Sequence, residues 1–178
     1  NQKKSGRCWM FAGLNLLRVG AMKKMHLKEF EFSQNYTFFW DKLERSNYFL
    51  QRIIEMVDRP ADDRSVAWLL ERPLDDGGQW NMFVNLIKKH GLVSQAFLPE
   101  TESSSNSGKR NGIVLHKLRE GAKTLRDMAA KDASFDELQD TKEEIIVAVY
   151  RILSIHLGTP PTSFDWQWND ADKKFHSD

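Results

Sequence analysis

The segment QKKSGRCWMFAG, residues 2–13, joins a polar loop to an apolar helical pattern at a cysteine. Residues 1–7 are polar and include a glycine, which predicts a loop. From Cys8 onward the apolar residues recur at helical spacing, so we expect a helix from about Cys8 to Met25. The apolar positions are Met10, Leu14, Leu17 and Ala21, with Phe11 beside Leu14. Cys8 is therefore expected where the loop becomes the helix.

The position of Cys8 favours a reactive thiol. A thiol reacts as its thiolate, and a free cysteine has a pKa of about 8.5. The N–H groups and the dipole at a helix N-terminus stabilise an anion. Lys3, Lys4 and Arg7 add positive charge nearby, which we expect to be solvated and screened. Cys8 is the only cysteine, which excludes an intrachain disulfide and fits a reducing compartment. The alternative for a lone cysteine is a small buried hydrophobic residue.

Gln2 and Gly6 fit the same chemistry. Attack on a carbonyl group creates an oxyanion, which two hydrogen-bond donors can stabilise. The side-chain amide of Gln2, six residues before Cys8, could be one donor, and the backbone N–H of Cys8 the other. Gly6 lets the chain turn tightly in front of the nucleophile.

The chain continues with a mostly helical pattern. Apolar stripes and end signals predict further helices. They run from Ser33 to just before Pro60, from Asp63 to Glu71, from Trp80 to Gly91, from about Leu115 to Ala129, and from the capping box Ser134–Glu137 to His156. The stretch 99–112, PETESSSNSGKRNG, predicts a polar surface loop.

The pattern changes after Gly158. Phe164, Trp166 and Trp168 alternate with polar residues, which predicts a strand, and residues 169–172 predict a turn. Residues 173–176 are typical of the start of a returning strand, and we expect its sheet partners to lie outside this chain. A helical body with strand only at its end indicates the helical half of an α+β fold.

Composition excludes several classes of function. The chain has 178 residues, 40% of them hydrophobic, and a net charge of +1. This charge gives no support for a nucleic-acid surface. No apolar run approaches the roughly 20 residues needed to span a bilayer. Because the chain does not begin with methionine, we expect residues 1–178 to be one partial domain of a longer protein.

The segment around Cys8 resembles the nucleophile motif of the aminopeptidase C/bleomycin hydrolase family, within the papain-like cysteine peptidases. The resemblance covers essentially the whole chain. It extends to FEFSQNYTFFWDKLERSN at 30–47, DDGGQW at 75–80, GLVSQAFLPET at 91–101 and GTPPTSFDW at 158–166. It implies an α+β papain-like fold, of which this chain holds the nucleophile-bearing, mostly α-helical half with strand only near its C-terminal end.

The resemblance also implies roles for individual residues. Cys8 would be the nucleophile that forms an acyl-enzyme, and Gln2 the oxyanion donor. Trp9 would pack beside the site, and the backbone of Gly77 and Gly78 would pair with an extended peptide substrate. The alternative for the two glycines is a plain turn. Intact members of the family are cytoplasmic hexamers that trim peptide N-termini, and no cofactor is implied.

A thiolate nucleophile also needs a partner imidazole. The spacing typical of papain-like enzymes gives the window 138–158, which contains His156. His156 continues the apolar stripe of its helix, so we expect it to face the core. His26 and His90 are expected at helix ends, His116 on a polar surface and His176 near the end of the chain, and no spacing predicts a metal site.

We therefore expect the catalytic histidine and asparagine to lie in a sheet half outside this chain. Two alternatives remain open. The chain could be a non-catalytic helical fragment or binding module, or Cys8 could be a redox-sensing thiol, in which case Gln2 has no assigned role.

Overall fold

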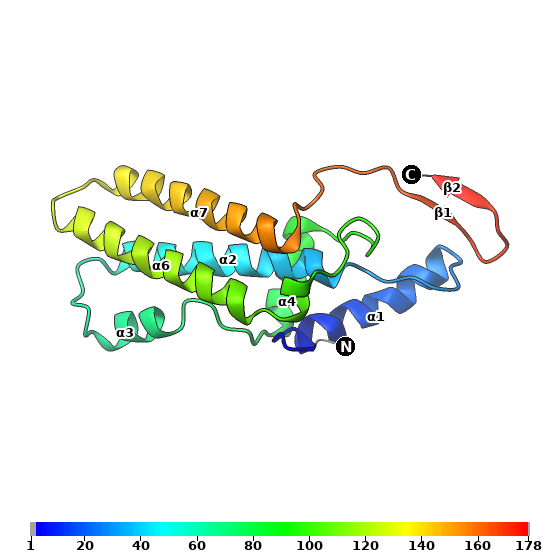
Figure 1. The fold of residues 1–178 in the computed structure, drawn as a ribbon, viewed down its shortest axis with the longest axis horizontal. Helices are drawn as coiled ribbons and strands as arrows, with labels where there is room; N and C mark the ends of the chain where they lie inside the picture. Colours follow the sequence, from blue (N-terminus) through cyan, green and yellow to red (C-terminus); the bar gives the residue numbers. More distant parts are fainter. Residues whose placement is uncertain (1–2, 178) are drawn as a thin grey trace.

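Three long helices lie side by side and form the body of the molecule (Figure 1). They are α2 (Gln34–Glu55), α6 (Gly108–Ala129) and α7 (Phe135–Leu157). The computed structural model describes residues 3–177. The core between these helices is apolar and includes Leu50, Ile53, Val114, Leu118, Leu125, Val149 and Leu153. The apolar stripes that predicted the helices are therefore the surfaces that pack together.

The capping signals in the sequence mark true helix starts. The Ser33 hydroxyl accepts a hydrogen bond from the Tyr36 N–H at 2.9 Å and caps α2. Asp63 caps α3 (Arg64–Glu71) in the same way. Ser134 and Glu137 form the expected capping box of α7. These three helix starts are confirmed.

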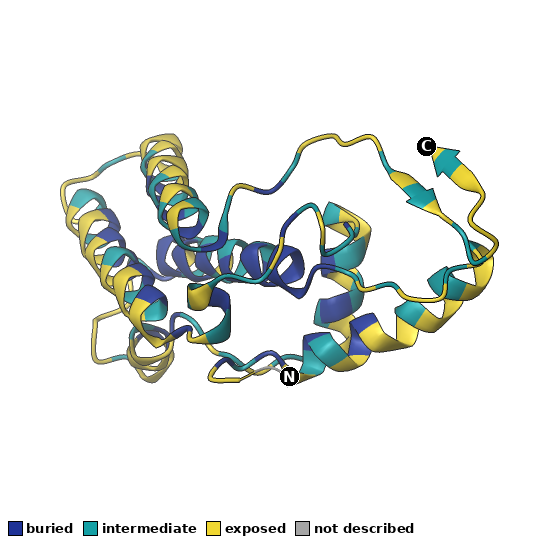
Figure 2. Cartoon of the chain, turned by 45° about the vertical axis from the view of Figure 1, so that its right-hand side comes forward, coloured by how far each residue is buried: buried dark blue, intermediate teal, exposed yellow. Residues whose placement is uncertain are grey.

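Helices α1 (Cys8–Lys24) and α4 (Trp80–His90) pack against one end of this body. Only the first half of α1 is buried there, through Met10, Gly13 and Leu14, whereas its second half is largely exposed (Figure 2). A Cβ on Gly13 would come within 2.6 Å of the Phe83 ring. This glycine therefore allows α1 to approach α4 closely.

The stretch 99–112 is not the surface loop that its composition predicts. It contains the short helix α5 (Glu102–Ser105), and α6 already begins at Gly108. Thr101 starts α5 with a capping box, in which its hydroxyl accepts from the Ser104 N–H at 3.0 Å. The prediction is wrong because serine-rich composition hides a capping signal.

A short antiparallel hairpin ends the described chain. Strands β1 (Gln167–Asn169) and β2 (Phe175–Ser177) pair in the register Gln167↔Ser177, Trp168↔His176 and Asn169↔Phe175. Within residues 3–177, β1 and β2 form a sheet of two strands, as the turn signal predicts.

The aromatic run before the hairpin is less regular than its pattern predicts. Phe164 and Trp166 precede the strand, and Trp166 packs on Phe30 with ring centroids 5.6 Å apart. The Ala171 N–H donates to the His26 carbonyl at 2.7 Å. The hairpin therefore lies against the C-terminal end of α1.

Candidate active site

Cys8 is the first residue of α1, and its thiol is free and exposed. Arg7 occupies the N-cap position but makes no side-chain capping bond. The backbone N–H groups of the first turn are therefore not covered by a capping side chain. The placement of Cys8 at a helix start is the one predicted, whereas Gln2 lies outside the described residues.

The loop 75–78 lies directly against the segment that carries Cys8. A Cβ on Gly6 would come within 2.1 Å of the Asp76 Cβ, so the turn before the nucleophile accepts only glycine. The Trp9 indole N–H donates to the Asp76 carbonyl at 3.2 Å. Trp9 and the glycine loop are thus in direct contact.

The two glycines of this loop have different surroundings. A Cβ on Gly78 would come within 2.4 Å of the Trp9 ring, whereas a Cβ on Gly77 would meet no atom within 4 Å. The Gly77 carbonyl accepts a hydrogen bond from the Arg45 guanidinium, which also bonds Asp41 at 2.8 Å. Gly78 is therefore required by the packing of Trp9, and Gly77 leaves open space beside the loop.

A buried lysine anchors the glycine loop to α2. Lys42 is fully buried, and its ammonium group donates to the Asp75 carbonyl at 3.1 Å and to the Asp76 carboxylate at 2.9 Å. It also lies 3.5 Å from the Asp41 carboxylate. Because α2 belongs to the helical body, the loop beside Cys8 is held by the core of the molecule.

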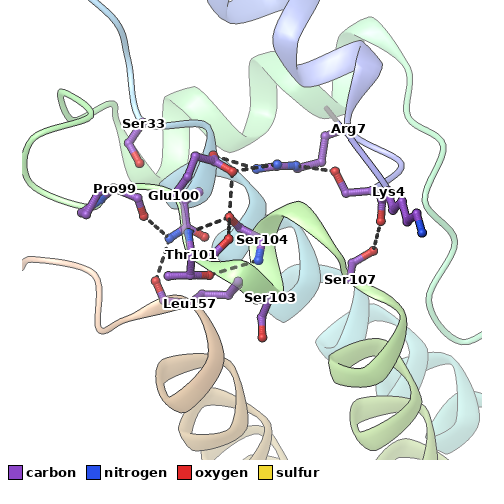
Figure 3. Close-up of polar contacts among 12 residues, drawn as sticks. Lys4, Arg7, Ser33, Pro99, Glu100, Thr101, Ser103, Ser104, Ser107 and Leu157 are labelled. Atoms are coloured by element: carbon purple, nitrogen blue, oxygen red, sulfur yellow. Dashed lines mark hydrogen bonds and ion pairs between the residues drawn. The ribbon is translucent and has the colours of Figure 1, made fainter. Parts of the chain in front are cut away.

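Arg7 is not solvated, contrary to the sequence-based expectation. Its side chain is fully buried and binds both Glu100 oxygens, at 2.9 and 2.8 Å (Figure 3). Burial raises the pKa of Glu100, but hydrogen bonds from Arg7 and Ser104 outweigh it and hold that pKa below its ordinary value. The expectation failed because the partner lies 93 residues away, where no local pattern reveals it.

Buried positive charge surrounds one phenylalanine near the site. The guanidinium carbons of Arg7 and Arg110 lie 5.0 and 4.3 Å from the centre of the Phe38 ring, and the Lys42 nitrogen lies 5.2 Å from it. Burial lowers the pKa of Arg110 to about 10. Phe38 is itself fully buried, so its ring faces supply part of the contact that these cations lose with water.

His156 lies at the edge of the core instead of within it. Its Nδ1 is 3.1 Å from the Ser103 hydroxyl of α5, and it is half-buried. The inward positions of α7 are taken by Leu153 and Leu157. The expectation that His156 faces the core is therefore corrected.

The other histidines lie near the helix ends and hairpin expected for them. His90 ends α4, stacks on Trp40 and bonds Glu44; His176 bonds Asp170; His26 lies 3.5 Å from Asp172; and His116 is exposed on α6. Four of the five histidines thus have polar partners other than Cys8. Across residues 3–177, no three His, Cys, Asp or Glu side chains are grouped to hold a metal ion.

The helix-start cysteine, its tryptophan and the adjoining glycine loop are the arrangement expected of a papain-like cysteine peptidase. The model of the peptidase C1-like family matches residues 1–178, and the chain belongs to that family. No helix within residues 3–177 combines the length and apolar character needed to cross a membrane.

Named relatives narrow the family further. Aminopeptidase C of Lactobacillus delbrueckii subsp. lactis is 44% identical over 178 residues, which are 100% of this chain and 40% of that protein. Bleomycin hydrolase of Gallus gallus is 44% identical and matches 99% of this chain and 39% of its own length. These matches confirm the resemblance drawn from the motifs.

A solved structure shows the same fold. The crystal structure of PepW from Lactobacillus rhamnosis HN001 is 50% identical, with a TM-score of 0.95 over 100% of this chain and 40% of that one. The chain therefore spans about two fifths of the length of the relatives that it matches.

Proposed function

We propose that this chain carries the nucleophile of a cysteine-type aminopeptidase, with Cys8 as the attacking thiolate. The observation that carries the proposal is the exposed Cys8 at the start of α1, with the glycine loop held beside it through Trp9. Support also comes from relatives named aminopeptidase C and bleomycin hydrolase. The activity belongs to the longer protein.

The proposed chemistry is acyl transfer through a covalent intermediate. The Cys8 sulfur attacks the carbonyl carbon of the scissile peptide bond, and the oxyanion takes hydrogen bonds from Gln2 and the Cys8 N–H. The imidazole that took the thiol proton then gives it, as imidazolium, to the leaving amine as the C–N bond breaks. Water next hydrolyses the thioester, giving its proton to the same imidazole and releasing the thiol. We expect this imidazole, and the asparagine that orients it, to lie in a sheet half outside this chain.

Peptides are the proposed substrates. Gly77 offers open space beside the nucleophile segment, where an extended peptide can pair with loop backbone. Gly78 and Trp9 border this proposed peptide-binding position. We further propose that the longer protein works in the cytoplasm as a homohexamer and needs no cofactor.

The test is a substitution of the nucleophile in the longer protein. Cys8→Ser should lower hydrolysis of an aminoacyl p-nitroanilide by about 10³-fold or more, because a serine in this place lacks a thiolate. The matched control, Ser65→Ala at an exposed position of α3, should retain wild-type activity. Full activity of Cys8→Ser would refute the proposed role. An N-acetylated substrate should be cleaved poorly if a free N-terminus is required.

The second candidate is a non-catalytic helical module. It is favoured because four of the five histidines have polar partners other than Cys8. Iodoacetamide separates the two functions, because Cys8 is the only thiol of this chain. If the protein is a peptidase, iodoacetamide at pH 6 should alkylate Cys8 faster than it alkylates free cysteine. If the chain is a non-catalytic module, Cys8 should react no faster than free cysteine. A redox role instead requires a peroxide-dependent sulfenate at Cys8 that dimedone can trap.

A further inference from the structure

The Arg7–Glu100 pair joins the residue before the nucleophile to the helical body. Every nitrogen of the Arg7 side chain donates a hydrogen bond. Nε donates to the Ser5 hydroxyl at 2.8 Å, and the two terminal nitrogens donate to the Glu100 carboxylate. The guanidinium carbon also lies 5.2 Å from the centre of the Phe11 ring and 5.0 Å from that of Phe38. Arg7 therefore has one well-defined orientation (Figure 3).

Glu100 is held as firmly as Arg7. Its second oxygen accepts a hydrogen bond from the Ser104 hydroxyl at 2.7 Å, within the first turn of α5. On the other side, the Asn35 amide donates to the Pro99 carbonyl at 2.8 Å and to the Leu157 carbonyl at 2.7 Å. The Glu100 carboxylate is thus held by a segment whose hydrogen bonds connect α2, α5 and α7 (Figure 3).

A backbone link runs parallel to the side-chain link. The Lys4 N–H donates to the Ser105 carbonyl at 3.0 Å, and the Ser107 N–H donates to the Lys4 carbonyl at 3.2 Å. The Arg7 carbonyl in turn accepts from the Phe11 N–H at 3.0 Å, which closes the first turn of α1 around Cys8. A shift of Arg7 therefore moves the first turn that carries the thiol.

We propose that Glu100 is a positioning residue, which acts through Arg7 to set the orientation of Cys8. The inference rests on the proposed function. A buried ion pair is a poor device for stability alone, since apolar residues of similar volume often serve as well. Two parallel N–H···O bonds fix the plane of a guanidinium, which a single charge contact does not. The Arg7–Glu100 pair thus fixes the orientation of Arg7, the residue next to the nucleophile.

The experiment compares two half-buried glutamates in the full-length protein. Glu100→Gln removes the positioning carboxylate, and Glu44→Gln removes a control carboxylate of similar exposure, 32% against 27%, that pairs with Lys89 and His90. The readouts are kcat, KM, melting temperature and the pH profile of Cys8 alkylation by iodoacetamide.

Glu100→Gln should lower kcat by about tenfold or more with little change in KM, since small misplacements of a reacting group are costly in rate. Its alkylation profile should also change, and Glu44→Gln should change neither property. Arg7→Lys keeps the charge but lacks the fork, so it should behave like Glu100→Gln. Glu100→Asp keeps the negative charge on a shorter side chain. It replaces Glu100→Gln and Arg7→Lys as the test variant if those two do not fold.

Two outcomes overturn the inference. The first is a folded Glu100→Gln with wild-type kcat and alkylation profile. The second is a loss of kcat that only follows the melting temperature and is matched by Glu44→Gln. Failure of the proposed function is recognised separately, because Cys8→Ser would then remain active. An inactive Cys8→Ser beside a fully active Glu100→Gln rejects the positioning role alone.

Discussion

The indole ring of Trp9 lies on the backbone of Gly78, where a Cβ would come within 2.4 Å of it. The same indole donates its N–H to the Asp76 carbonyl at 3.2 Å. One side chain thus contacts the glycine loop through both its ring face and its polar edge. The residue after the nucleophile therefore sets how far the loop stands from α1.

The two loop glycines should respond differently to alanine. Gly78→Ala should destabilise the protein by about 1–3 kcal/mol, because the added methyl group overpacks against Trp9. Gly77→Ala meets no atom within 4 Å and should leave the melting temperature unchanged. If a peptide approaches Gly77, that variant should raise KM. Equal melting temperatures for the two variants would show that Trp9 does not restrict Gly78.

Two of the three glycines of α6 give a second comparison. Gly112 has open space around it, so Gly112→Ala should stabilise the helix by about 1 kcal/mol through helix propensity. Gly121 is the matched control, because a Cβ there would come within 2.9 Å of an Ile145 methyl group. Gly121→Ala should gain nothing or lose stability. Urea unfolding of both variants measures the difference, and a gain at Gly121 contradicts the tight contact of α6 with α7.

The stability of the protein should depend on the ionisation of Glu100. Its pKa is below the ordinary 4.5 in the folded state, so the unfolded chain takes up the proton first as pH falls. Between the two pKa values the unfolded state binds more protons, and stability rises with pH. The contribution is complete above the unfolded pKa and is lost as pH falls through the folded one.

Glu100→Gln isolates this contribution. At neutral pH it should cost up to about 3 kcal/mol, the lower end of the range for a broken buried pair, because the Glu100 side chain is 27% exposed. The free-energy difference from the wild type, measured by urea unfolding from pH 7 to pH 3, should shrink toward acid. A difference that stays constant over that range would assign the effect to packing.

The capping box of α7 predicts a local loss of stability. Ser134→Ala removes the hydroxyl that accepts from the Glu137 N–H and should cost about 1 kcal/mol. Ser154→Ala, on the same helix, is the control, because its buried hydroxyl has no hydrogen-bond partner among the described residues. That variant should be nearly neutral. Similar losses for both serines in thermal unfolding would argue against the cap.

The helices could be predicted because their signals are local. Ser33, Asp63 and Ser134 each precede an apolar stripe, and each caps a helix. The prediction for the stretch 99–112 was wrong because a serine-rich composition is typical of a loop. In the structure Thr101 starts a helix and Arg110 is buried. Contacts with the distant Lys4 help to order this stretch, and a window along the sequence does not contain them.

The candidate site was predictable only in part for the same reason. Cys8, Trp9 and the glycine pair lie in segments that resemble family motifs, so the sequence singles them out as candidates, and their roles are proposals. Arg7 was expected in solvent because a charged residue in a polar loop is normally hydrated. Its burial depends on Glu100, in the loop before α5, and on the Phe38 ring of α2. The charge of Arg7 is thus balanced by a partner that its neighbours in sequence do not reveal.

The 93-residue separation of Arg7 and Glu100 also sets the order in which the molecule can assemble. During synthesis Cys8 emerges long before the glutamate that holds its neighbour. Closing a loop of this length costs chain entropy before the contact stabilises the fold, so distant contacts form slowly. The thiol-bearing turn therefore cannot take its final geometry until the chain has been made as far as Glu100, and until then it carries an exposed cysteine without a fixed nucleophile.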